Sequence, residues 1–99
     1  MVKHIVLWDL IDTLTDEEKE TAALKMKSIL EDLNGKIPGL LESSVVINQE
    51  PSSNRDIALF TTLESMNALA KYKVHPEHVN AGKFIRAVTC NRACIDYEV

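Results

Sequence analysis

TDEEKETAALKMKSILEDLNG, residues 15–35, contains the clearest helix signal in the chain. It begins with a capping box, in which the Thr15 hydroxyl accepts from the Glu18 N–H and the Glu18 carboxylate reaches back to Thr15. Asn34-Gly35 is expected to end the helix, because it supplies a residue that tolerates positive φ. The pattern predicts a helix whose apolar stripe is core, made of Ala22, Ala23, Met26, Ile29, Leu30 and Leu33.

Strands are predicted on both sides of this helix. Residues 2–10 read as a strand with apolar residues on both faces, and residues 40–48 alternate in the manner of a second strand. A polar loop at 50–54 leads into a third strand at 55–63, so these two strands are expected to form a hairpin. Ser65 can cap a short helix to about Tyr72, and Pro76 favours a new helix to about Val88. A last strand is predicted over 89–99.

This order of elements is the ferredoxin-like βαββαβ pattern of the α+β class. We therefore predict one domain, residues 1–99, with a four-stranded antiparallel sheet and helices on one face. The other face would still carry apolar residues such as Ile5 and Leu7. A half-covered apolar face favours a homodimer, in which two such sheets face each other and form a barrel.

Composition excludes several classes of protein. The formal net charge of -4 argues against binding to nucleic acid, which needs a basic face. The apolar runs are too short to span a membrane, and Asp9 interrupts the first run too early for a signal peptide, so we expect a cytoplasmic protein. Cys90 and Cys94 would lie ~13 Å apart on one face of a strand, too far for a disulfide, and are expected to be reduced.

Four segments together resemble the stress-responsive A/B barrel family, also called Dabb. They are VKHIVLW (2–8), IPGL (37–40), KYKVHPEHVNAGKFIR (71–86) and CIDYEV (94–99). The resemblance extends over essentially the whole chain. It implies a ferredoxin-like protomer and a homodimer closed by sheet-to-sheet packing, a dimeric α+β barrel.

One branch of that family looks like plant polyketide cyclases of the olivetolic acid cyclase type, which close a linear polyketide thioester into an aromatic ring without a cofactor. By that resemblance Tyr72 and His78 would be the catalytic pair, Asp96 would contact the histidine and His4 would line the pocket. The chain departs from that branch at Thr89 and Arg92, where bulky apolar residues would stand, and residues 15–35 contain no Phe or Tyr. The polyketide substrate therefore does not carry over.

The residues themselves also suggest an acid/base site. If Pro76 begins a helix, His78 lies in the first turn, where the helix dipole disfavours a charged imidazole, and a neutral imidazole can act as general base. Asp96 is expected to accept from one ring nitrogen of His78, and Tyr72 to donate to a substrate carbonyl. His75 is expected only to cap the turn. The predicted pocket is lined by His4, Val6, Trp8, Leu59, Ala81 and Gly82.

Two function classes stay open. One is a small cofactor-free enzyme or ligand-binding protein acting on a compact carbonyl compound. The other is a non-catalytic, stress-associated dimer in which His78 and Asp96 are structural. A metal site would need His4, His75, His78 and Asp96 to converge, but helical ligands usually lie at i and i+4, so no metal is predicted. A haem site, known in relatives of the dimeric α+β barrel, has no further support, and no cofactor is predicted.

Overall fold

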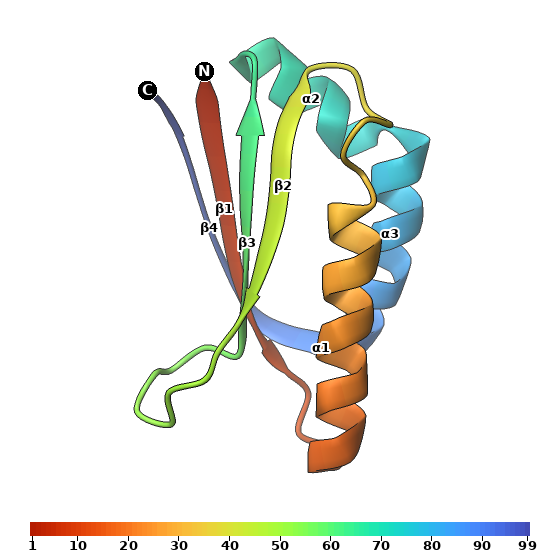
Figure 1. Cartoon of the computed structure of the whole chain (residues 1–99), viewed down its shortest axis with the longest axis vertical. Helices are drawn as coiled ribbons and strands as arrows, with labels where there is room; N and C mark the ends of the chain where they lie inside the picture. The colour runs from red at the N-terminus through yellow and green to blue at the C-terminus, as the bar shows by residue number, and fades with distance from the viewer.

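A four-stranded antiparallel sheet forms one layer of the molecule, and three helices pack on one face of it (Figure 1). The computed structural model describes residues 1–99. The elements in chain order are β1 (Val2–Leu10), α1 (Asp16–Glu31), β2 (Leu40–Ile47), β3 (Ile57–Leu63), α2 (Met66–Val74), α3 (Pro76–Val88) and β4 (Thr89–Glu98). The strand order is β2-β3-β1-β4. The predicted ferredoxin-like βαββαβ fold is confirmed, with two short helices in its second helical position.

The capping box at the start of α1 forms as predicted. The Glu18 N–H donates to the Thr15 hydroxyl at 3.1 Å, and the Thr15 N–H donates to the Glu18 carboxylate at 2.9 Å. The predicted end of this helix is wrong by about one turn, because α1 ends at Glu31. Beyond it the backbone tightens into three-residue turns and reverses at Gly35, whose φ is 82°. None of the three helices is long and apolar enough to cross a membrane.

Strand β1 lies between β3 and β4, and one of its faces is buried beneath the helices. The residues on that face are Val2, His4, Val6, Trp8 and Leu10. They pack against α1, α2 and α3 through Met26, Leu30, Tyr72 and Ile85. His4 is the polar member of this face and is only 3% exposed. The central strand therefore carries a histidine into the core.

The other face of the sheet has no helix over it. Its register aligns apolar residues of neighbouring strands in two rows, Phe60–Ile5–Ile95 and Val46–Ala58–Leu7–Ala93. The exposed fractions are 52% for Val46, 43% for Phe60, 58% for Ile95 and 41% for Tyr97. We call this surface the open sheet face. The predicted apolar second face is therefore present.

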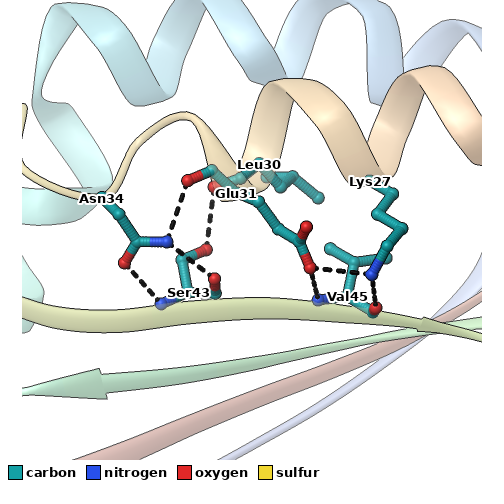
Figure 2. Close-up of polar contacts among 6 residues, drawn as sticks. All are labelled: Lys27, Leu30, Glu31, Asn34, Ser43 and Val45. Atoms are coloured by element: carbon teal, nitrogen blue, oxygen red, sulfur yellow. Dashed lines mark hydrogen bonds and ion pairs between the residues drawn. The ribbon is translucent and has the colours of Figure 1, made fainter.

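Side chains of α1 and of the turn after it cover the outer edge of β2 (Figure 2). Asn34 accepts from the Ser43 N–H and donates to the Ser43 carbonyl, both at 2.9 Å. One turn earlier, Glu31 accepts from the Val45 N–H at 3.0 Å, and Lys27 donates to the Val45 carbonyl at 2.8 Å. These contacts occupy backbone groups that an edge strand normally leaves open. Another strand therefore cannot add to this part of β2 without displacing them.

Candidate active site

His4 and Asp96 face each other across β1 and β4, where their Cα atoms are register partners. The His4 Nδ1–H donates to the Asp96 carboxylate. The Sγ of Cys94 lies 3.7 Å from the His4 Nδ1 atom and 3.8 Å from an Asp96 oxygen. The predicted hydrogen bond between His78 and Asp96 is therefore wrong. Directly opposite residues of an antiparallel pair have neighbouring Cβ atoms, so the strand histidine reaches the carboxylate first.

His78 takes its orientation from the backbone instead. Its Nδ1 atom lies 3.1 Å from the carbonyl oxygen of Lys73, in the last turn of α2. A carbonyl oxygen only accepts hydrogen bonds, so Nδ1 carries the proton and Nε2 keeps a free lone pair. Burial lowers the pKa of His78, and the electrostatic effects of His4, Arg86 and Arg92 act in the same direction, while the bond to the Lys73 carbonyl opposes them. The neutral ring is thus favoured.

The break between α2 and α3 sets this geometry. His75 ends α2 and caps α3, and its Nδ1 atom accepts from the Glu77 N–H at 3.1 Å. Pro76 follows as the first helical residue, where a missing N–H leaves no helical bond unmade. The predicted capping role of His75 is confirmed. Because His78 lies three residues beyond this cap, its ring can reach back to the last turn of α2.

Tyr72 packs between the two site histidines. Its ring centroid lies 4.4 Å from that of His78 and 5.9 Å from that of His4. The side chain is fully buried, and this raises the pKa of Tyr72 to about 12, although the nearby Thr61 hydroxyl moderates the rise. The two hydroxyls do not meet hydrogen-bond geometry, and each lacks a partner. Tyr72 therefore stays protonated at neutral pH and holds an unused donor.

A cavity of about 270 Å³ opens between the helices and β1. Its lining residues are His4, Val6, Trp8, Leu30, Leu59, His78, Gly82, Ile85, Arg86 and Arg92. The predicted residues His4, Val6, Trp8, Leu59 and Gly82 are among them. Tyr72 and Asp96 do not line the cavity; Tyr72 packs against the ring of His78, and Asp96 contacts His4.

Ala81 was predicted for this cavity and lies elsewhere. It lines a separate hollow between α1 and α3, together with Ile29 and Phe84. Gly82 and Ile85 lie four and seven residues after His78, so the three side chains lie on one stripe of the helix. Ala81 is turned toward α1 instead. The prediction was wrong because Ala81 and Gly82 are adjacent on the helix and point in different directions.

Sequence reasoning did not identify Arg86 and treated Arg92 only as a departure from the family pattern, not as a residue of the cavity. Arg86 lies one turn beyond Gly82 on the same stripe of α3. Arg92 shares a face of β4 with Cys94 and Asp96. Both positions could have been found from helical and strand periodicity, because each continues a stripe that already contained a predicted site residue.

The sequence profile of the Stress responsive A/B Barrel Domain matches residues 2–99. A dimeric protein of ferredoxin-like fold from Bacteroides fragilis is 38% identical, with a TM-score of 0.93 over 99% of this chain and 95% of that one. A dimeric ferredoxin-like protein from Thermobifida fusca is 22% identical, with a TM-score of 0.84 over 99% and 90% of the two chains. The identity to the second protein is low enough that only the fold is shown to be shared.

A hydroxynitrile lyase from Passiflora edulis also has this fold. It is 14% identical, with a TM-score of 0.81 over 99% of this chain and 92% of that one. No curated protein sequence matches the chain. The profile match extends over nearly every residue, and the chain therefore belongs to the stress responsive A/B barrel domain family.

Proposed function

We propose that the cavity beneath the helices catalyses cofactor-free proton transfer on a small carbonyl compound, with His78 as general base. The observation that carries this proposal is the fixed tautomer of His78. Its Nδ1–H is held by the Lys73 carbonyl at 3.1 Å, and the ring lines a cavity of about 270 Å³. The free Nε2 lone pair, on a ring whose pKa is lowered by burial, suits proton abstraction near neutral pH.

In this reaction a C–H bond next to the carbonyl breaks. Its electron pair forms an enolate, and the proton passes to Nε2 of His78. Return of that proton to the product restores the neutral imidazole, so no cofactor is consumed. His4 lines the same cavity and is held by Asp96, so its second ring nitrogen can donate to the carbonyl oxygen when protonated. Asp96 then positions His4, and Tyr72 positions His78 through ring contact.

The test follows the exchange of carbonyl-adjacent protons for deuterium by NMR, over a panel of small keto acids and ketones. The parent protein should accelerate exchange in at least one compound, and His78→Ala should abolish that acceleration. His75→Asn is the matched control, because it keeps a capping side chain outside the cavity. Equal rates for the two variants, or no acceleration by the parent, would leave the non-catalytic dimer, with His78 and Asp96 structural, as the better account.

A divalent metal site is the second candidate. The ligand atoms of His4, Cys94 and Asp96 all lie within 4.8 Å of one another. A nitrogen, a sulfur and a carboxylate oxygen are the donors that zinc prefers, and three protein ligands leave a fourth position open. Zinc chloride should then raise the melting temperature of the parent and not that of Cys94→Ser. Equal responses would remove this candidate.

We also propose that the protein is a homodimer in which two open sheet faces pack together. The Bacteroides fragilis relative, 38% identical, is described as dimeric. Val46, Phe60 and Ile95 expose apolar surface on this face, and the contacts to Ser43 and Val45 obstruct association through the β2 edge.

The β2–β3 loop projects on the side away from the helices (Figure 1) and borders a hollow of about 440 Å³ with Leu7 and Ala58. A second copy would fill that hollow. Light scattering should give about twice the chain mass of 11.1 kDa.

A further inference from the structure

The cavity beneath the helices is lined by positively charged side chains and by no acidic ones. Two of the three arginines in the chain, Arg86 and Arg92, line it, and no aspartate or glutamate does. Neither arginine belongs to an ion pair, since the two pairs in the structure are His4–Asp96 and Lys27–Glu31. A chain with a formal net charge of -4 thus concentrates unpaired guanidinium groups at one opening.

The local backbone accommodates both arginines. A Cβ added at Gly82 would lie 2.9 Å from the Nη1 atom of Arg86, so the glycine leaves room for the guanidinium to lie against α3. Arg92 follows an irregularity in β4, where Asn91 adopts a φ of 53° and its side chain donates to Asp9 at 2.9 Å. The extra residue places Arg92 on the helix-covered face with Cys94 and Asp96. The two guanidinium groups therefore reach the cavity from different elements.

We infer that the cavity takes a compact carbonyl compound that carries a carboxylate, with Arg86 and Arg92 binding the carboxylate at the mouth. This inference rests on the proposed function and names its substrate class. A planar guanidinium fork matches the two oxygens of a carboxylate. The inner wall of Val6, Trp8 and Leu59 suits an apolar body next to His78. The volume of about 270 Å³ lies near the lower end of ligand pockets, which fits a body of about one ring.

The test compares phenylpyruvate with its uncharged methyl ester, both of which have an acidic CH₂ group next to a carbonyl. Binding is measured by NMR titration for the parent, Arg86→Gln, Arg92→Gln and the control Lys83→Gln. Lys83 is an exposed cation of α3 outside the cavity, so the control removes the same charge from the same helix. Phenyl phosphate serves as a third probe, because its tetrahedral anion separates phosphate recognition from carboxylate recognition.

The parent should bind phenylpyruvate about tenfold or more tightly than the ester, because charge-assisted hydrogen bonds contribute that much. Each arginine variant should lose about tenfold in affinity for phenylpyruvate and none for the ester, while Lys83→Gln should match the parent. Equal affinity for acid and ester, or equal losses in Lys83→Gln, would overturn the inference. Tighter binding of phenyl phosphate would reassign the mouth to phosphate and overturn it too.

Binding and chemistry can fail separately in this design. Arginine-dependent binding of phenylpyruvate without deuterium exchange would support the carboxylate site and remove His78 as a base. Equally fast exchange in the acid and the ester, unchanged in both arginine variants, would support the base and overturn the carboxylate site. Both arginines are exposed, so the two variants should have the same melting temperature as the parent.

Discussion

His4 and Asp96 are partners across two strands, and the ring of His4 donates to the carboxylate of Asp96. The Asp96 carboxylate therefore binds His4 on the strand, whereas His78 on the helix is held by the backbone carbonyl of Lys73. A carbonyl fixes the tautomer of His78 without adding a negative charge that would favour imidazolium. This division leaves one neutral ring and one carboxylate-bound ring on the wall of the same cavity.

Replacing Asp96 by Ala should cost about 1–3 kcal/mol of unfolding free energy, because it leaves the buried Nδ1–H of His4 without its acceptor. Denaturant unfolding followed by circular dichroism measures this change. Glu98→Ala, two residues further along β4 at an exposed position, is the control and should change stability by less than about 0.5 kcal/mol. Similar losses in the two variants would mean that the His4–Asp96 contact adds no stability.

The lowered pKa of His78 predicts a pH dependence of stability. The unfolded chain takes up a proton at this residue as the pH falls through about 6.5, whereas the buried ring in the folded protein resists protonation. Acid therefore favours unfolding. His78→Gln lacks this proton uptake, so its unfolding free energy relative to that of the parent should rise as the pH is lowered from about 7.5 to about 5.5.

The same property predicts the acid limb of the proposed reaction. Deuterium exchange catalysed by the parent should persist below pH 6.5, and its midpoint should lie on the acid side of that value. His75→Asn should show the same profile, because His75 caps α3 outside the cavity. A midpoint above the ordinary histidine value would contradict burial as the controlling factor.

The buried phenol of Tyr72 predicts the opposite behaviour in alkali. Its pKa is raised to about 12 in the folded protein, so between about pH 10 and 12 only the unfolded chain releases this proton. The unfolding free energy of the parent should fall over that range. Tyr72→Phe should remove this fall and stay close to the parent at neutral pH, because its lost hydroxyl had no partner.

Tyr97 provides the control for that experiment. It is the other tyrosine of the chain and is 41% exposed. Tyr97→Phe should lose stability in alkali as the parent does. If Tyr72→Phe also follows the parent curve, then the phenol of Tyr72 does not resist ionisation in the folded state.

Local patterns were enough to predict the fold. The capping box at Thr15, the cap at His75 and the apolar residues of β1 are patterns among residues close in sequence. The ferredoxin-like order of elements followed from them. The end of α1 was misplaced because the side chain of Asn34 bonds to Ser43 in another element, a contact that no local pattern reveals.

The site was harder to predict for the same reason. The family resemblance suggested His4 for the pocket, and helix periodicity related Gly82 to His78; the three residues line one cavity. Which group Asp96 contacts depends on the register between β1 and β4, which brings together His4 and Asp96 from 92 residues apart in the chain. A sequence motif relates Asp96 to a histidine, but only the paired strands decide which histidine that is.

Asn34→Ala should expose the outer edge of β2. The variant loses two hydrogen bonds to the backbone of Ser43, at a cost of about 1 kcal/mol, since water can reach the exposed Asn34 position. Free edge groups also allow pairing with other chains, so scattering by aggregates should increase on storage. Asn54→Ala, in the exposed loop after β2, should match the parent in both measurements. Unchanged stability and scattering in Asn34→Ala would show that the covering side chains are dispensable.

Ile95→Asp should convert the proposed homodimer into a monomer. Ile95 is 58% exposed at the β4 end of the row Phe60–Ile5–Ile95, so a charge there would be buried without a partner when two open sheet faces meet. Light scattering at matched concentrations should give about one chain mass of 11.1 kDa for this variant. Leu24→Asp is the control, because Leu24 is 55% exposed on α1, away from the sheet. It adds the same charge at a similarly exposed apolar position and should leave the dimer intact. A dimeric Ile95→Asp, or a monomeric Leu24→Asp, would place the contact on the helices and leave the open sheet face without its proposed partner.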